Sequence, residues 1–300
     1  MNDILNKIPP MLTGVELEQT LRVLPQYTDG IRTKPAAQRL LALNSLFDAY
    51  IPNKMGMEIY TKIYLSLVRS LQNKALKASI EQRNINAQSL QNNTFIPCRG
   101  INGQDTFSII GESGIGKSTA INRSIEIMNG RNVIITNQPH CKIIPALFVQ
   151  CPFDCSAKTL LLDINRKIDS NIGTSYYDMY IKARSSTNQI LIGTAQALLN
   201  HVAVLIIDEV QNLIKHRAGN QLIMLITELL NESKTSIVMV GTPESESFFS
   251  SVEYFSRRTL GLRYSRYNYD LQFHDFCKCI WSYQYTANYV DINEGFINYL

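Results

Sequence analysis

The sequence predicts an α/β fold in which a parallel β-sheet is flanked by helices and preceded by an N-terminal helical extension. The first observation is a set of short, nearly continuous apolar runs, the pattern of strands that are buried on both faces of a parallel sheet. These runs are TFSII at 106–110, NVIIT at 132–136, IPALFVQC at 144–151, VAVLIID at 202–208 and SIVMV at 236–240. The second observation is that helical stretches separate the last three runs, at about 157–169, 187–200 and 217–231. The third is a glycine-rich loop that joins the first strand to a helix at 119–128.

The order of these segments also predicts a local hairpin. The runs at 132–136 and 144–151 are joined by NQPHCK, so they are interpreted as neighbouring antiparallel strands that lead into the core of the sheet. The other strands are separated by helices, which favours parallel crossovers.

Composition limits the class of protein. The chain has 300 residues, 45% of them apolar, which is enough to fill a substantial core. Its formal net charge of +4 permits a nucleic-acid partner but lacks the strongly basic signature of a dedicated binder. The six cysteines form no C-x-x-C pair and are interpreted as cytosolic thiols rather than zinc ligands. With neither a signal peptide nor 18 consecutive apolar residues, we expect a cytoplasmic protein with no membrane segment.

The N-terminal third is predicted to be helical and separate from the sheet. Turn-forming residues in 1–35 indicate an extended arm with brief helices, and apolar spacing from Pro35 onward indicates two helices. An Asn-, Gln- and Lys-rich stretch at 72–105 is interpreted as a helix tail and linker. The predicted division is therefore an arm at 1–35, a helical extension at 36–95, a core at 96–275 and a C-terminal segment at 276–300.

The segment GESGIGKS at 111–118 matches G-x-x-x-x-G-K-[ST] at every fixed position, between a strand and a helix. Its glycines let consecutive backbone N–H groups point at phosphate oxygens, next to the positive end of the following helix. The predicted nucleotide-binding residues are Gly111, Glu112, Ser113, Gly114, Ile115, Gly116, Lys117, Ser118 and Thr119. Lys117 is expected to bridge the β- and γ-phosphates, and Ser118 to ligate Mg²⁺. Thr119 either reaches the α-phosphate or is an ordinary threonine of a first helical turn.

Two acids follow a wholly apolar strand. Asp208 and Glu209 end VAVLIIDE, at the carboxyl edge where ligands of open α/β sheets bind. Asp208 is predicted to coordinate Mg²⁺, and Glu209 to polarise the water that attacks the γ-phosphate. The alternative is a pair of exposed acids that cap a strand.

Further polar residues follow the last predicted strand. The hydroxyl of Thr242 is expected to hold the attacking water between Glu209 and the γ-phosphate, unless it is only a turn threonine before proline. Downstream, FSRRTLGLRYSR contains Arg257, Arg258, Arg263 and Arg266. Arg257 and Arg258 are the candidates for a finger that reaches the nucleotide of a neighbouring subunit; solvated or phosphate-contacting arginines are the competing interpretation.

Together these motifs resemble the P-loop NTPase core of the AAA+ (ASCE) ATPases. Within AAA+ proteins, four segments resemble the TnsC/TniB group of transposition ATPases over roughly residues 36–270. These are LFDAYIPNKMGMEIYTKIYLSLVRSL, IIDEVQNL, MVGTPESESFF and the following SRR. The resemblance implies an ATP- and Mg²⁺-dependent regulator that assembles as rings or filaments on double-stranded DNA. It would link a target-selector protein to the transposase.

The resemblance also implies DNA contacts from loops of the core. The matching positions lie in CPFDCSAKT, notably Lys158, and in NIGTSYYDMYIKAR, notably Thr174 and Lys182. A departure is that the sequence ends at INEGFINYL, where a first lid helix is expected to begin, so we expect the small helical lid to be largely absent. The alternatives are a nucleotide-switched signalling or defence ATPase, or a helicase-loader-like ATPase, neither with a transposition role.

Overall fold

A computed structural model of the chain describes residues 4–74, 80–81, 85, 105–130, 132–137, 140–154, 156–212, 219–233, 235–246, 261–266 and 269–299. Its contacts form two compact units, which are described separately below. The first combines Met1–Met11 with Glu58–Tyr264, and the second combines Leu12–Met57 with Ser265–Leu300. The division predicted at residues 35, 95 and 275 stays a prediction, and most of the predicted linker at 72–105 lies outside the described residues.

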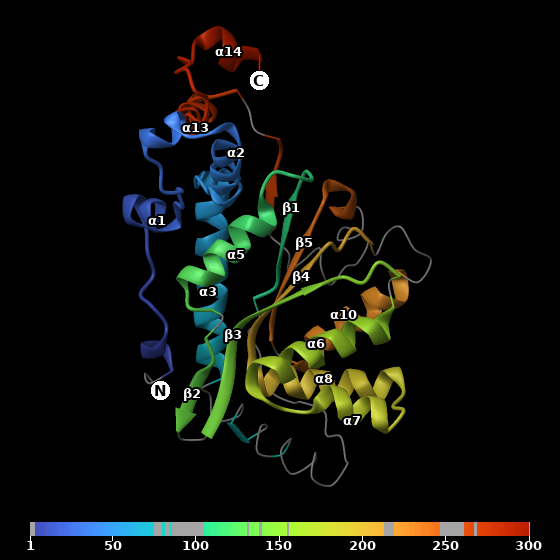
Figure 1. Cartoon of the computed structure of the whole chain (residues 1–300). Helices are drawn as coiled ribbons and strands as arrows, with labels where there is room; N and C mark the ends of the chain where they lie inside the picture. The colour runs from blue at the N-terminus through green and yellow to red at the C-terminus, as the bar shows by residue number, and fades with distance from the viewer. Residues whose placement is uncertain are drawn as a thin grey trace. The chain divides into compact units, whose positions relative to one another are not determined.

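The first unit is built on a six-stranded sheet, which confirms the predicted α/β fold class (Figure 1). Its strands are β1 (Phe107–Gly111), β2 (Ile134–Asn137), β3 (His140–Gln150), β4 (Val202–Asp208), β5 (Ser236–Gly241) and β6 (Leu262–Tyr264). They follow the order β2-β3-β4-β5-β1-β6, and every neighbouring pair is parallel except β2 and β3.

The predicted hairpin is confirmed, although β3 is longer than expected and β2 begins and ends later in the sequence. Asn137 of β2 pairs with His140 of β3, so much of NQPHCK belongs to the strands rather than to the connection. Antiparallel pairing satisfies backbone N–H and C=O groups that a longer loop would have left to water. Strand β6 was not predicted; its side chains are half-buried or exposed, so it carries no continuous apolar run.

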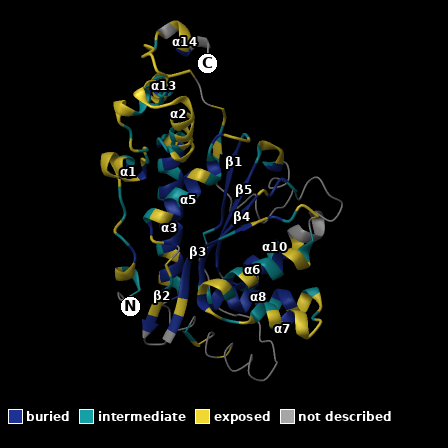
Figure 2. Cartoon of the chain, in the orientation of Figure 1, coloured by how far each residue is buried: buried dark blue, intermediate teal, exposed yellow. Residues whose placement is uncertain are grey.

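Burial explains the strands that were predicted. Every residue of β1, β4 and β5 is buried, and Figure 2 shows these strands in dark blue between the helices. One face of the sheet packs on α6 (Ala157–Ile172), α8 (Thr187–His201) and α10 (Gly219–Ser233), each within three residues of its predicted bounds. Ser156 and Ser186 are the N-cap residues of α6 and α8, and their side chains accept hydrogen bonds from first-turn N–H groups.

The other face of the sheet packs on α3 (Lys54–Lys74) and α5 (Lys117–Ile127), as Figure 1 shows. The predicted apolar stripe of α3 is buried, and it consists of Ile59, Ile63, Leu67 and Leu71. On the same helix, the hydroxyl of Ser70 donates a hydrogen bond of 2.6 Å to the carbonyl oxygen of Ala203 in β4. The short helices η1 (Leu5–Lys7), α7 (Tyr176–Lys182) and η4 (Pro243–Ser245) complete the described part of this unit.

The second unit combines a segment near the start of the sequence with the C-terminal segment, Ser265–Leu300. It contains α1 (Gly14–Leu21), η2 (Asp29–Thr33), α2 (Ala36–Leu43), η3 (Asn44–Asp48), α13 (Leu271–Trp281) and α14 (Glu294–Tyr299). Tyr27 connects its two parts: the ring lies edge-on to Tyr283 and Tyr285, and the hydroxyl donates to the carbonyl oxygen of Gln284 at 2.8 Å. Across both units, the described residues include no helix that is long and apolar enough to cross a membrane.

Candidate functional site

The strand order brings three predicted motifs to one edge of the sheet. Strand β5 lies between β1 and β4, and all three are parallel. Their carboxyl ends therefore adjoin one another: Gly111 ends β1, Gly241 ends β5 and Asp208 ends β4. The glycine-rich loop, Thr242 and the two acids follow these three ends, where ligands of open α/β sheets bind.

The loop at 111–118 connects β1 directly to α5, as predicted. Gly114 and Gly116 have φ angles of +83° and +90°, a region in which side chains other than hydrogen are strained. Gly111 is required for a different reason, because a Cβ there would lie 2.6 Å from Cδ1 of Ile115 and 3.0 Å from the carbonyl oxygen of Tyr264. The backbone thus curls in front of the first turn of α5, where free N–H groups and the helix dipole favour an anion.

Lys117 is the first residue of α5 and is 9% exposed. Its ammonium donates to the carbonyl oxygens of Gly111, at 2.6 Å, and Glu112, at 2.8 Å. Burial lowers the pKa of Lys117, while the nearby charges of Asp208 and Glu209 act in the opposite direction. A phosphate could replace these carbonyls and supply the negative charge that a buried ammonium favours.

Ser118 and Asp208 meet across a separation of 90 residues in sequence. The Ser118 hydroxyl donates to Oδ2 of Asp208 at 2.7 Å, and Asp208 is 4% exposed. A hydroxyl and a carboxylate are the hard oxygen ligands that Mg²⁺ takes in combination with phosphates and waters. These two residues therefore fit the metal site that the sequence predicts.

Glu209 has an unusual backbone and a fixed side chain. Its φ angle is +61°, and its N–H donates to Oδ1 of Asp208 at 2.8 Å. Its carboxylate accepts a hydrogen bond from the side-chain amide of Gln211. Non-glycine residues with left-handed backbones cluster at functional sites, where the surrounding structure holds them.

Thr242 directly follows β5, and its N–H donates to Oε1 of Gln211 at 3.3 Å. Its hydroxyl oxygen is buried and has no hydrogen-bond partner among the described residues. Sequence reasoning missed Gln211, which joins Glu209 to Thr242. A signal was available, because the polar pair Gln211 and Asn212 follows the acids within three positions, but the sequence alone does not give the direction of the Gln211 side chain.

Several predicted residues remain outside this arrangement. Arg257 and Arg258, the finger candidates, lie outside the described residues. Arg263 lies on β6, where its guanidinium pairs with Glu246 at 2.7 Å. Thr119 is exposed in the first turn of α5, which leaves both of its interpretations open.

We expected the candidate DNA contacts to lie in loops, but two of the three lie in helices. Lys158 is in the first turn of α6 and donates to the carbonyl oxygen of Ser185 at 3.2 Å. Lys182 ends α7, a helix that was not predicted and that forms because Tyr180 is buried against the core. Thr174 lies between the two helices and donates to Oδ1 of Asp169 at 2.6 Å. Lys158 and Lys182 thus lie on helices, whereas Thr174 lies in the short loop between α6 and α7.

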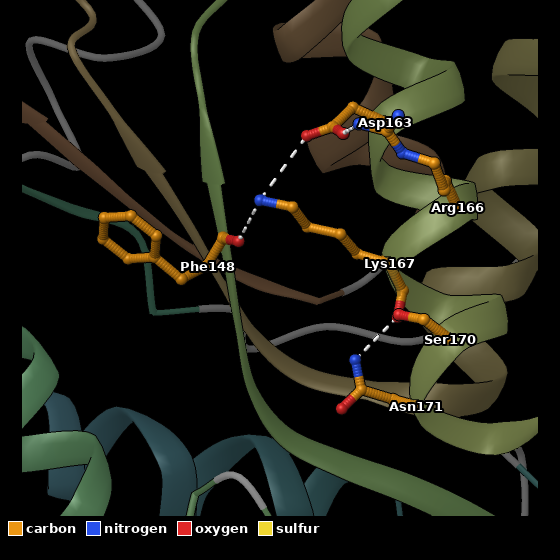
Figure 3. Close-up of polar contacts among 6 residues, drawn as sticks. All are labelled: Phe148, Asp163, Arg166, Lys167, Ser170 and Asn171. Carbon is orange, nitrogen blue, oxygen red and sulfur yellow. Dashed lines mark hydrogen bonds and ion pairs between the residues drawn. The ribbon is translucent and has the colours of Figure 1, made fainter.

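Further along α6, a pair of cations shares one carboxylate (Figure 3). Lys167 donates to the carbonyl oxygen of Phe148 at 2.9 Å and lies 3.6 Å from the carboxylate of Asp163, which also pairs with Arg166. The side chain of Arg166 is 66% exposed, whereas that of Asp163 is 19% exposed. Arg166 is therefore a cation with an accessible side chain on the helix that also carries Lys158.

The comparison with protein families covers strands β1 to β5 and the candidate site. Residues 101–249 match a family model described as "AAA domain". A solved structure, that of the Aeropyrum pernix Orc1 protein in complex with DNA, is 15% identical with a TM-score of 0.41. The similarity covers 68% of this chain and 49% of that one, so it spans about half the length of the solved protein. The comparison with curated proteins found no matching relative.

Proposed function

We propose that this chain, whose residues 101–249 match a family model described as "AAA domain", is a P-loop AAA+ NTPase that binds ATP with Mg²⁺ and hydrolyses it. The observation that carries the proposal is the 2.7 Å contact between Ser118 and Asp208, beside the ammonium of Lys117. It brings together one residue of the loop and one of the acidic strand end, two motifs that are far apart in the sequence.

Each residue of this site has a distinct proposed role. The backbone N–H groups of the loop at 111–119 hold the phosphates, and Lys117 neutralises the charge on the β- and γ-phosphates. Ser118 and Asp208 hold Mg²⁺, which when bound neutralises charge that develops on the phosphates. Glu209 orients and deprotonates the attacking water, and the buried hydroxyl of Thr242 is available to hold it.

The finer proposal is an ATP-dependent, DNA-binding regulator of transposition. It rests on the four segments that resemble the TnsC/TniB group, IIDEVQNL and MVGTPESESFF among them. In this proposal the subunits form rings or filaments on duplex DNA, with Arg257 or Arg258 reaching a neighbouring nucleotide. A transposase and a target-selector protein are the proposed protein partners.

The catalytic proposal is tested with Glu209→Gln. This variant keeps the size of the side chain but loses the base, so the rate of ATP turnover should fall about 100-fold or more while nucleotide affinity stays near wild type. Turnover is measured by phosphate release and affinity by calorimetry. Undiminished turnover in the variant would refute the role of Glu209.

The DNA proposal is tested by the salt dependence of binding to duplex DNA. Replacing Lys158 and Lys182 with alanine should weaken binding and reduce the slope of log K against log salt by about 0.9 for each lost phosphate contact. The matched control is Lys34→Ala, which removes an exposed lysine of the second unit. Equal slopes for all three proteins would count against these contacts.

Electron micrographs with ATP and DNA test the assembly. Rings or filaments that require both ligands are expected. An ATP turnover rate that DNA leaves unchanged, together with a protein partner captured through residues 1–95, would instead favour the signalling or defence alternative.

A further inference from the structure

The Gln211 side chain makes two contacts within the candidate site. Gln211 lies in the turn after β4 and is 7% exposed. Its Nε2 atom donates to Oε2 of Glu209, and its Oε1 atom accepts from the N–H of Thr242 at 3.3 Å. A primary amide both donates and accepts, so one side chain can hold a carboxylate and a backbone N–H at the same time.

The turn that carries Gln211 is itself fixed to both neighbouring strands. The N–H of Val210 donates to the carbonyl oxygen of Val240 in β5 at 3.0 Å. On the other side, Nδ2 of Asn212 donates to the carbonyl oxygen of Cys151, just past β3, at 3.4 Å. Because Val210 is held through its backbone and Asn212 through its side chain, the turn between them directs the amide of Gln211 at the site before any ligand binds.

Gly241 allows the turn to lie this close to β5. A Cβ on Gly241 would lie 2.7 Å from Cγ2 of Val210 and 3.3 Å from Oε1 of Gln211. A larger residue at the end of β5 would therefore push the turn away and lengthen the contact between Gln211 and Thr242. The approach of the two segments depends on glycine for space, not for a positive φ angle.

From these contacts we propose that Gln211 is a positioning residue for ATP hydrolysis, which holds the Glu209 carboxylate at a place set by the main chain of Thr242. The inference rests on the proposed function. Gln211 contacts no reacting atom in this scheme and acts through Glu209. A shift of the end of β5, where Thr242 lies, would move the carboxylate as well, so both residues would respond to the nucleotide together.

Two substitutions separate this role from simple packing. Gln211→Met keeps the approximate volume and removes both hydrogen bonds, whereas Gln211→Glu keeps the acceptor for Thr242 and loses the donor to Glu209. Both should lower kcat about 10- to 100-fold, because a small misplacement of a catalytic group is costly, while the dissociation constant for ATP stays within about twofold. Melting temperatures measured without nucleotide report whether each variant is folded.

A double-mutant cycle tests whether Gln211 acts through Glu209. The variant that combines Glu209→Gln with Gln211→Met should turn over ATP no more slowly than Glu209→Gln alone. The matched control is Gln196→Met, which replaces another buried glutamine, 5% exposed and on α8, and should leave kcat unchanged.

The outcomes also separate this inference from the proposed function. Folded wild-type protein that releases no phosphate from ATP would overturn both. Wild-type turnover with an unchanged kcat for folded Gln211→Met and Gln211→Glu would overturn only the role of Gln211. Additive losses in the double variant would likewise show that Gln211 does not act through Glu209.

Discussion

Two buried lysines of the first unit make the same kind of contact in different electrostatic surroundings. Lys117 donates to the carbonyl oxygens of Gly111 and Glu112 in the phosphate loop. Lys74 is 2% exposed and donates to the carbonyl oxygens of Leu198 and Leu199 in the last turn of α8, at 3.1 and 2.5 Å. The difference between them lies in the helix end at which each ammonium is placed.

Lys74 meets the carboxyl end of α8, where the helix dipole is negative and carbonyl oxygens have capacity to accept further hydrogen bonds. Its charge is therefore stabilised by the protein itself. Lys117 belongs to the amino-terminal turn of α5, where the dipole is positive and the neighbouring N–H groups are donors. Asp208 and Glu209 lie near this ammonium, and a bound phosphate would add negative charge at the free N–H groups of the helix end. The comparison teaches that a buried lysine marks a ligand site when it stands beside the free N–H groups that begin a helix rather than at the carbonyl groups that end one.

The largest expected effect that tests this comparison is on nucleotide affinity. Lys117→Met should lower the affinity for ATP about 100- to 4,000-fold, since removing one partner of a buried charge pair costs roughly 3–5 kcal/mol. The free energy of unfolding without nucleotide should change less than it does for the corresponding change at Lys74, because burial disfavours the charged form of Lys117 and so opposes the gain from its two hydrogen bonds. Calorimetric titration and denaturant unfolding measure the two quantities. Equal ATP affinity in the variant and the wild type would refute the assignment of Lys117 to a nucleotide-binding site.

A smaller effect of the opposite kind is expected at α8. Lys74→Met should lower the free energy of unfolding by about 2 kcal/mol, because two carbonyl groups at a helix end lose a charged donor. The dissociation constant for ATP should stay at the wild-type value. Urea unfolding and the same titration test both statements. A weakened affinity without a loss of stability would mean that the two lysines have been assigned the wrong roles.

Much of this arrangement followed from the sequence because its signals are local. The apolar runs of β4 and β5 predicted buried strands, and the glycines predicted a tightly curled loop, which the structure forms with positive φ angles at Gly114 and Gly116. The fixed spacing of Gly, Lys and Ser in GESGIGKS is typical of a phosphate-binding loop, so the motif predicts the conformation of the loop as well as its position. The predicted apolar stripe of α3 was correct for the same reason, because helical periodicity is a local property.

The features that the sequence did not yield depend on contacts between distant segments. Strand β6 is only partly buried, so its sequence lacks the apolar run that predicts a strand, and α7 is too short to show a helical period. The direction of the Gln211 side chain depends on how the turn after β4 packs on β5. The buried place of Lys74 likewise depends on α3 meeting the end of α8, and nothing near residue 74 in the sequence indicates it.

The smallest predicted effect concerns backbone strain at the phosphate loop. Gly116 precedes α5 with a φ angle of +90°, and a Cβ built there meets no atom within 4 Å, so an alanine would be strained but not crowded. Gly116→Ala should cost about 1–2 kcal/mol of stability, the penalty for a left-handed backbone in an L-residue. The matched control is Gly30→Ala in η2, which is equally uncrowded but has no positive φ angle, and it should be neutral or slightly stabilising. Denaturant midpoints of the two variants measure the difference, and equal changes would show that the loop stores no such strain.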